Sequence, residues 1–559
     1  MRPRQRRWNF RWHNNMEEIL INQALEEQSD MTAVENFAFK HDFHQLPQGS
    51  ACYKELIPKK TPGPGQQYAF EVNLDQCTGC KACITACHNE NGLEEDETWR
   101  SVGLIHSVSA DKPMMQHVTT ACHHCLDPAC MNGCPVKAYE KDPVTGVVKH
   151  LDDQCIGCQY CILKCPYDVP KYNKKKGIVH KCDMCISRLK VGEAPACVRA
   201  CPNEAIRITL IETAVVRQDP SAFVKIPQAP DSNYTLPTTR YVTQKDLTPD
   251  MASIDATIFE PEHPHMPLVV MLVLTQLSVG AFCVEWVVNH SLPDNLRALL
   301  MPAHVFTGLV FGLLALVASL FHLGRPLYAF RALLGIKTSW LSREILSFGL
   351  FAGLAFLYAV QIIYTSAKPS LHSEVLGGLV LTVGLGAVFT SVMVYRDTKR
   401  VLWDTPMTFF KFFMTVAMLG TVTVLTVSLS VCLCYSPRHF ADVLQVVGIP
   451  LAGLLVGSTL LKIIGEASIF SHLRNPQMTA LKKSAVLMSG ALRAWTAQRF
   501  IYGVVGGIVI PSLLVAVYAY LTPVWTLVWV VGLGLMSVAG ELMERYLFFR
   551  AVIPLKMPQ

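Results

Sequence analysis

Sixteen of the chain's twenty cysteines fall in four groups that share an opening and a closing spacing. Each group opens with Cys-x-x-Cys and closes with Cys-x-x-x-Cys, and proline follows the last cysteine in three of them. Proline fixes the backbone and removes an amide donor where the chain turns away. The groups are Cys77, Cys80, Cys83 and Cys87; Cys122, Cys125, Cys130 and Cys134; Cys155, Cys158, Cys161 and Cys165; and Cys182, Cys185, Cys197 and Cys201.

This spacing is typical of bacterial ferredoxins that hold two iron–sulfur cubanes. Three cysteines of a tight loop cap three corners of one cubane, and the fourth reaches the partner cluster, so the groups work in pairs. The four groups therefore predict two ferredoxin-like modules with four [4Fe-4S] clusters.

Two other uses of so many thiols are disfavoured. Disulfides need an oxidising compartment, and the basic, aromatic start MRPRQRRWNFRWHNN does not indicate a secretion signal. Structural zinc sites use Cys-x-x-Cys, but they do not usually add a third such step and a trailing Cys-Pro. The net charge of +6 is too small to indicate nucleic-acid binding.

The composition changes sharply along the chain. Charged residues make up 16% of it, against about 25% in soluble proteins, and the deficit lies in the second half. We expect an N-terminal extension over 1–70 with an amphipathic helix at 16–30, and a double ferredoxin-like α+β domain over 71–212. A proline-dotted tail and linker follow over 213–266, and an all-α membrane domain over 267–559.

Eight apolar segments of the second half are each close to the roughly 20 residues that a spanning helix needs. Glycine is frequent in them, as expected where helices pack closely in lipid. The sequence therefore predicts a multi-pass protein. The expected spans are 268–288, 299–321, 345–364, 375–395, 412–434, 443–464, 500–521 and 524–547.

The charges of the connecting loops predict an orientation. Loops on the side of the cysteine-rich domain carry fifteen Lys and Arg residues, and the opposite loops carry three, Arg297, Lys368 and Arg438. Positive loops stay in the cytoplasm. We therefore expect the inner membrane, with the cysteine-rich domain facing the cytoplasm.

Polar groups at membrane depth are costly unless they are used. The densest set, His322, Arg325, Arg343 and Glu344, lies where the second and third spans approach the cysteine-rich domain. Oxidation of a quinol needs proton acceptors beside its hydroxyls, and these residues could meet around such a head group. The alternative is that they only reach the interface or pair with one another.

Other polar residues in the spans favour simpler roles. Glu541 and Arg545 are spaced i, i+4, which predicts an internal ion pair, whereas Glu466 remains ambiguous. His304 and His322 do not form facing pairs, so no haem is expected. The four remaining cysteines are expected to act as small apolar side chains in the packing; they are Cys52, Cys283, Cys432 and Cys434.

Several strings resemble the iron–sulfur and membrane-anchor subunits of dimethyl sulfoxide reductase and related molybdenum oxidoreductases. The first half carries CTGCKACITACHNEN, CHHCLDPACMNGCP, CIGCQYCILKCPYDVPKYN and KCDMC. The second half carries HLGRPLYAFRALL, SWLSREI, WDTPMTFFKFF and GELMERYLFF, which are similar to a haem-free anchor of eight spans. The resemblance implies that two components of a three-component complex are fused here.

The resemblance also implies roles for particular residues. The anchor would oxidise menaquinol beside His322 and Glu344, and a separate catalytic subunit would hold a molybdenum bis-pterin. The implied cluster ligands are Cys77, Cys80, Cys83 and Cys201; Cys182, Cys185, Cys197 and Cys87; Cys122, Cys125, Cys130 and Cys165; and Cys155, Cys158, Cys161 and Cys134.

We therefore expect an electron-transfer subunit that links the quinone pool to a catalytic partner, with no residue acting on the final substrate. Three alternatives stay open. A dehydrogenase partner would drive the same path in reverse, a polysulfide-reductase-type anchor would move ions, and a passive scaffold would do neither. Cysteine spacing does not supply the cluster potentials that decide the direction of flow.

Overall fold

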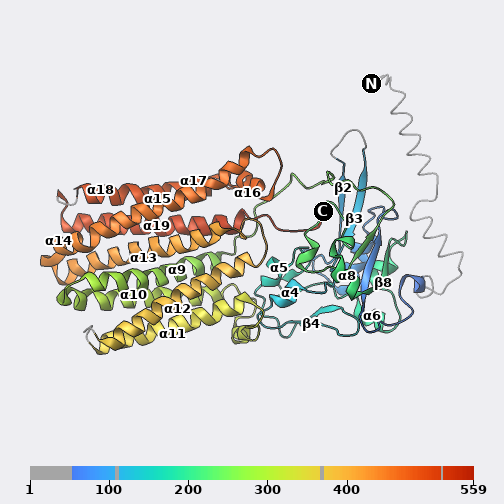
Figure 1. The fold of residues 1–559 in the computed structure, drawn as a ribbon, viewed down its shortest axis with the longest axis horizontal. Coiled ribbons are helices and arrows are strands. Elements are labelled where there is room, and N and C mark those ends of the chain that lie inside the picture. The colour runs from blue at the N-terminus through green and yellow to red at the C-terminus, as the bar shows by residue number, and fades with distance from the viewer. Residues whose placement is uncertain (1–52, 108–112, 366–369, 518–519, 559) are drawn as a thin grey trace, which may run out of the picture.

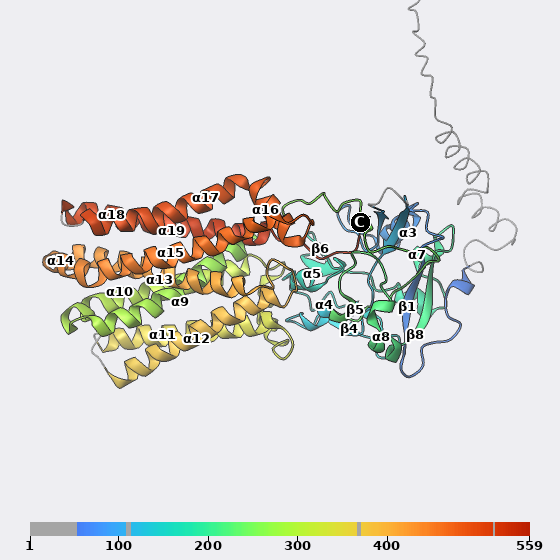
Figure 2. The same cartoon turned by 45° about the horizontal axis from the view of Figure 1, so that its top comes forward.

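The computed structural model describes residues 53–107, 113–365, 370–517 and 520–558. It has an α+β part (residues 53–253) followed by a bundle of long helices (residues 266–550), which lie end to end (Figures 1 and 2). The expected α+β domain and all-α domain are therefore confirmed. The helix expected at 16–30 and Cys52 lie outside the described residues.

Two three-stranded sheets and two hairpins form the frame of the α+β part. The central strand β1 pairs antiparallel with β8 and parallel with β9, while β2 lies between β10 and β3. Hairpins join β4 to β5 and β6 to β7. The strands are β1 Gln66–Asn73, β2 Ser101–His106, β3 Met115–Thr120, β4 Tyr139–Lys141, β5 Val148–His150, β6 Lys171–Asn173, β7 Ile178–His180, β8 Ile206–Glu212, β9 Arg240–Val242 and β10 Ala252–Ser253.

The segment expected to be an extended tail contributes to this frame. It begins with the short helix α8 (Thr213–Gln218), and its strands β9 and β10 extend both sheets. The chain's end returns as well, because Met557 is buried in the core of the α+β part and Lys556 pairs with Asp255 at 2.5 Å. The tail is thus part of the sheet structure.

Short helices follow the cysteine loops. Several loops turn through the left-handed backbone region just before their helix, at Lys81 (φ 63°), Gln159 (φ 58°) and Cys185 (φ 47°). Such a turn costs a non-glycine residue about 1–2 kcal/mol, so the loop conformation must be held by what it encloses. The helices are α3 Ala82–Asn91, α4 Ala129–Asn132, α5 Tyr160–Lys164, α6 Ile186–Lys190 and α7 Ala196–Arg199.

Eight helical segments of the described chain are long and apolar enough to cross a membrane, which confirms the expected number. The sixth joins α14 and α15 and the seventh joins α17 and α18, each through a π-helical turn. The helices are α9 Met266–Ser291, α10 Asp294–Leu320, α11 Trp340–Tyr364, α12 Leu371–Arg396, α13 Pro406–Tyr435, α14 Phe440–Val443, α15 Ile449–Ala467, α16 Ala480–Ser489, α17 Arg493–Val504, α18 Ile510–Val517 and α19 Pro523–Arg550.

Helix α9 is the centre of the bundle and packs against α10, α12, α13 and α19. It meets α13 at a pair of glycines. A Cβ on Gly280 would lie 2.1 Å from the Val416 carbonyl oxygen, and one on Gly420 would lie 2.3 Å from the Gly280 backbone. Close backbone approach at small residues is how helices associate in lipid, where no hydrophobic driving force acts between them.

Polar contacts lock the two parts together. Tyr160 of α5 donates to the Val394 carbonyl at 2.9 Å, and Lys164 pairs with Asp397 at 2.8 Å. On the neighbouring loop, Ser339 donates to the Gly133 carbonyl at 2.7 Å. The third and second cysteine groups therefore rest directly on the end of the bundle.

Candidate functional site

Two cavities in the α+β part are each lined by four cysteines. In both, three cysteines come from one sequence group and the fourth comes from a different group, as expected for paired ferredoxin loops. Both sets match the ligand sets that the resemblance implies. They are Cys77, Cys80, Cys83 and Cys201 in one cavity, and Cys122, Cys125, Cys130 and Cys165 in the other.

The remaining eight cysteines gather in the same manner. Burial, followed by the neighbouring Cys197, raises the pKa of the Cys87 thiol to about 12. Burial also raises the pKa of Cys134 to about 11, and Cys155 adds to the shift. Thiols crowded in this way do not ionise unaided, and metal binding supplies the missing positive charge. Four-thiol sites of this kind fit iron–sulfur cubanes.

Two buried cations lie among these thiols. Arg100 is 2% exposed and Lys181 is 3% exposed, and neither pairs with a carboxylate of the described chain. Burial opposes the charge of Arg100, but Cys197, Cys83 and other thiols outweigh it and raise its pKa. Lys181 Nζ donates to Cys122 Sγ at 3.6 Å. An unpaired buried charge is very costly, so both cations fit anionic, thiolate-held clusters as their counter-ions.

The four thiol sets form a row. Cys83 of the first set lies within electrostatic reach of Cys197 in the second, and Cys182 of the second set lies near Cys122 in the third. Tyr139 lies between the third set and the fourth. The fourth set, which includes Cys158, lies against the bundle. The row therefore leads from the membrane to the distal end of the α+β part.

The HLGRP segment connects the row to the bundle. His322 Nε2 donates to the carbonyl oxygen of Cys158 at 3.1 Å. Next to it, three glycines stack backbone on backbone: a Cβ on Gly324 would lie 2.0 Å from the Gly177 oxygen, and one on Gly157 would lie 2.3 Å from it. Only glycine permits this approach, which holds His322 against the fourth thiol set.

A cavity of about 160 Å³ opens at this junction, between α5 and the helices α9, α10, α11 and α12. Most of its wall is apolar, and Cys158 forms part of its floor. Its polar lining includes His265, His322 and Glu344. Glu344 is 5% exposed, and its Oε1 has no hydrogen-bond partner among the described residues. The cavity thus combines an apolar slot with a few polar groups, as ligand sites do.

Two histidines stand together at the mouth of this cavity. The ring of His265 packs edge-on against that of His322, with their centroids 5.2 Å apart. Burial, then the nearby His322, lowers the pKa of His265 to about 3, and burial also lowers the pKa of His322. Both rings are therefore neutral at neutral pH.

The structure brings together two of the four residues that the sequence suggested for this site. His322 and Glu344 line the cavity, whereas Arg325 and Arg343 do not. Arg325 donates to the Asp152 carbonyl at 2.8 Å, and Arg343 donates to the Lys337 carbonyl at 2.8 Å. The two arginines therefore bind backbone carbonyls of nearby loops.

Comparison with known proteins supports the same division of the chain. A family described as "DMSO reductase anchor subunit (DmsC)" matches residues 261–550, which is more than half of the chain, and a "4Fe-4S dicluster domain" matches residues 113–210. The chain belongs to the DMSO reductase anchor subunit family. It is an iron–sulfur electron-transfer subunit fused to a DmsC-type anchor of DMSO reductase-like complexes.

Individual relatives match the α+β part. A subunit of the anaerobic dimethyl sulfoxide reductase of Haemophilus influenzae is 38% identical over 156 residues, which cover 26% of this chain and 76% of that protein. The Escherichia coli protein of the same name is 33% identical over 183 residues, which cover 31% of this chain and 86% of that protein. The formate dehydrogenase-O iron-sulfur subunit of E. coli is 32% identical over 167 residues, which cover 26% of this chain and 56% of that protein. This kinship implies a catalytic partner subunit.

Two features of the DmsC-type anchor were not found by sequence reasoning. His265 lies in the linker before α9, and only the fold brings it to His322, 57 positions later. The i, i+4 pair expected between Glu541 and Arg545 is wrong, because Glu541 pairs with Lys462 and Arg499, and Arg545 pairs with its neighbour Glu544. The spacing allowed the contact, but Glu541 is bound by cations of α15 and α17, and Arg545 is bound by the adjacent Glu544 of its own helix.

Proposed function

We propose that the DmsC-type anchor oxidises menaquinol in the cavity between His322 and Glu344, and that the electrons leave through the row of four thiol sets. The observation that carries the proposal is the bond from His322 to the Cys158 carbonyl, because one side chain touches both the cavity and a cluster loop. The electrons would then reach a molybdenum bis-pterin on a separate catalytic subunit.

The hydrogen bonds of His322 assign its chemistry. Its Nε2 carries a hydrogen because the Cys158 carbonyl can only accept, so in the neutral ring Nδ1 is the free acceptor. A quinol hydroxyl can donate to this nitrogen and lose its proton to it as the quinol is oxidised. His265 is in ring contact with His322 and helps to fix the orientation of that ring.

Glu344 serves the other hydroxyl of the quinol. It projects from the first turns of α11 into the cavity, and none of the described cations forms an ion pair with it. A carboxyl group without a cation partner in an apolar cavity is suited to accept and release protons. The two hydroxyls of one quinol thus have separate acceptors, as the loss of two protons requires.

The thiol sets would hold four [4Fe-4S] clusters, which pass single electrons when bound. The support is the lining of the two four-cysteine cavities and the unpaired cations Arg100 and Lys181. The positive loops lie at the end of the bundle that carries the α+β part, which supports an inner-membrane protein with that part in the cytoplasm.

Replacing Glu344 with Gln tests the site. In the purified chain with its clusters, we expect unchanged cluster spectra but at least tenfold slower reduction of the clusters by a menaquinol analogue, because the carboxyl acceptor is lost. Stopped-flow absorbance measures the rate. Glu374→Gln, an exposed residue of α12 that pairs with His290 at 3.0 Å, is the matched control. An unchanged rate in Glu344→Gln would remove this residue from the mechanism.

Flow in the reverse direction is the second candidate, because nothing in the cavity favours quinol over quinone. Redox titration of the clusters distinguishes the two. Midpoints near or above that of the menaquinone couple fit quinol oxidation, whereas midpoints all far below it fit a dehydrogenase partner that reduces quinone.

A further inference from the structure

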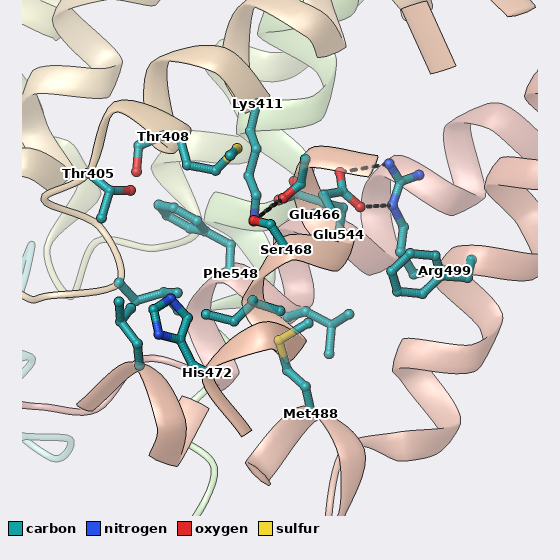
Figure 3. A pocket seen from close by; sticks show the side chains of 17 residues that line it. Thr405, Thr408, Lys411, Glu466, Ser468, His472, Met488, Arg499, Glu544 and Phe548 are labelled. Carbon is teal, nitrogen blue, oxygen red and sulfur yellow. Dashed lines mark hydrogen bonds and ion pairs between the residues drawn. The ribbon is translucent and has the colours of Figure 1, made fainter. Parts of the chain in front are cut away.

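A second cavity, of about 120 Å³, opens at the same end of the bundle but among different helices: α13, α15, α16, α17 and α19. Thr405, Thr408, Ser468 and His472 contribute polar groups to its wall (Figure 3). None of its lining residues comes from the α+β part. This cavity therefore has no direct contact with the thiol row, and electron transfer does not explain it.

A cluster of seven charged side chains, here called the ionic cluster, forms part of its wall and extends behind it. Its cations are Lys411, Lys462, Arg499 and Arg545, and its carboxylates are Glu466, Glu541 and Glu544. Six of them are at most 5% exposed, and only Lys411 is more accessible, at 19%. Figure 3 shows Lys411 reaching Glu544, and Arg499 clasping Glu466, at the cavity wall.

The ionic cluster has one positive charge more than it has negative charges. A buried charge without a counter-ion is very costly. Arginine does not give up its proton in a protein, whereas a buried lysine does so readily. Both lysines have carboxylate partners, but Lys411 is partly exposed and Lys462 is fully buried, so the extra charge costs most at Lys462.

Lys462 is well placed to gain and lose a proton. Its Nζ donates to Thr415 Oγ1 at 2.5 Å and to Glu541, and lies 3.7 Å from Glu466 Oε1. Glu466 is one helical turn nearer the α+β end and lines the cavity. A proton can therefore pass between the cavity and Lys462 by way of Glu466.

The polar route ends soon after Lys462. The hydroxyls of Thr459 and Ser537, about one turn further in, are buried and have no hydrogen-bond partner among the described residues. Beyond them, Leu455 and Leu533 belong to a packed apolar core. The route is thus open to one face of the bundle only.

We propose that Lys462 carries a proton that exchanges, through this cavity, with water on the α+β side of the membrane. In the exchange, an N–H bond of the Lys462 ammonium breaks and water takes the proton, leaving a neutral amine, and the reverse step restores it. The neighbours that face Lys462 or line its route come from every packed helix: Gln276 on α9, Lys411 and Thr415 on α13, Glu466 on α15, His472 before α16, Arg499 on α17, and Glu541, Glu544 and Arg545 on α19.

The ionic cluster lies back to back with the quinol cavity. Arg545 donates to Gln276 at 2.9 Å, and the next residue of α9, Thr275, lines the quinol cavity. Tyr395 also lines that cavity and packs on Phe548, which lines the second one. Electrons that arrive on the quinol side favour the protonated form of Lys462. This coupling to quinol rests on the proposed function, whereas the exchange itself does not.

The test is a redox titration of the clusters in the purified, lipid-embedded chain, repeated from neutral to alkaline pH. We expect the midpoint of the cluster nearest the membrane to fall as pH rises in the wild type. Lys462→Arg keeps the positive charge but cannot release it, so its midpoint should not change with pH. Lys399→Gln, a lysine that is 51% exposed on the same side, should behave as the wild type does. A pH-independent wild type, or a Lys462→Arg that follows the wild type, would mean a static ionic cluster.

A second variant covers the risk that Lys462→Arg does not fold. Thr415→Val keeps the shape and charge of the site but removes a hydrogen bond from Lys462, so the pH dependence should move to lower pH. An unmoved profile contradicts the proposal.

The number of protons released per menaquinol oxidised distinguishes the proton exchange alone from its coupling to quinol. If the wild type releases fewer than two protons at alkaline pH and Lys462→Arg releases two, the coupling is supported. Clusters that menaquinol does not reduce, but that still show the pH-dependent midpoint, refute the proposed function and leave the exchange standing.

Discussion

At the scale of single residues, the site depends on charged and neutral groups held in unusual states by burial. Arg100 and Lys181 stay cationic among thiols without a carboxylate partner, and His265 and His322 stay neutral at the cavity mouth. The buried cations are costly in an apolar interior unless an anionic ligand balances them, whereas burial favours the neutral form of the histidines. Substituting these groups should therefore change the redox and pH behaviour of the protein in defined directions.

Replacing Arg100 with Gln removes a positive charge beside Cys83 and Cys197. The extra electron of a reduced cluster is stabilised by that charge, so we expect a lower midpoint potential for the clusters of the first two thiol sets. Redox titration followed by electron paramagnetic resonance measures it. Lys81→Gln, an exposed cation in the loop of Cys80 and Cys83, is the control, and an equal shift in both variants would contradict a specific role for Arg100.

His265 makes the stability of the protein depend on pH. Its pKa is about 3 in the folded state, against an ordinary value of 6.5, so below pH 6.5 the unfolded chain takes up a proton that the folded chain refuses. We expect the unfolding temperature to fall between pH 6.5 and about 3, and to fall less steeply in His265→Gln. Thermal unfolding at a series of pH values tests this. His290→Gln, an exposed histidine at the far end of α9, should keep the wild-type slope.

At the scale of elements, the loop between α10 and α11 joins the two halves of the molecule. Replacing Gly324 with Ala puts a Cβ 2.0 Å from the Gly177 oxygen, and overpacking of this kind costs about 1–3 kcal/mol. We expect intact clusters but slower reduction by menaquinol, because His322 moves away from Cys158. Gly349→Ala, which has open space around it, is the control. A normal rate in Gly324→Ala would show that the close approach is dispensable.

The same scale shows what the sequence was able to predict. The thiol groups and the eight spans were found because local spacing and length decide them. The strands of the tail were missed, since β9 and β10 are very short and pair with strands more than 100 residues away. Lys462 and His265 were missed because their importance comes only from neighbours on other elements. The pair expected for Glu541 and Arg545 failed because cations of other helices bind Glu541 and the adjacent Glu544 binds Arg545.

At the scale of the whole molecule, fusion places the cavity beside His322 and the fourth thiol set in one contact surface between the two parts. Tyr160, Lys164, His322 and Ser339 all bind across the junction. The distance from cavity to clusters is therefore set by the fold and not by the assembly of two subunits. The isolated chain should then carry electrons from the membrane without its catalytic partner.

Anaerobic mixing of the isolated chain with a menaquinol analogue tests this central claim most directly. The chain should contain about sixteen iron atoms, and quinol should reduce part of its clusters, as seen by electron paramagnetic resonance. Clusters that are fully assembled and reducible by dithionite, but that stay oxidised with menaquinol, would contradict the account.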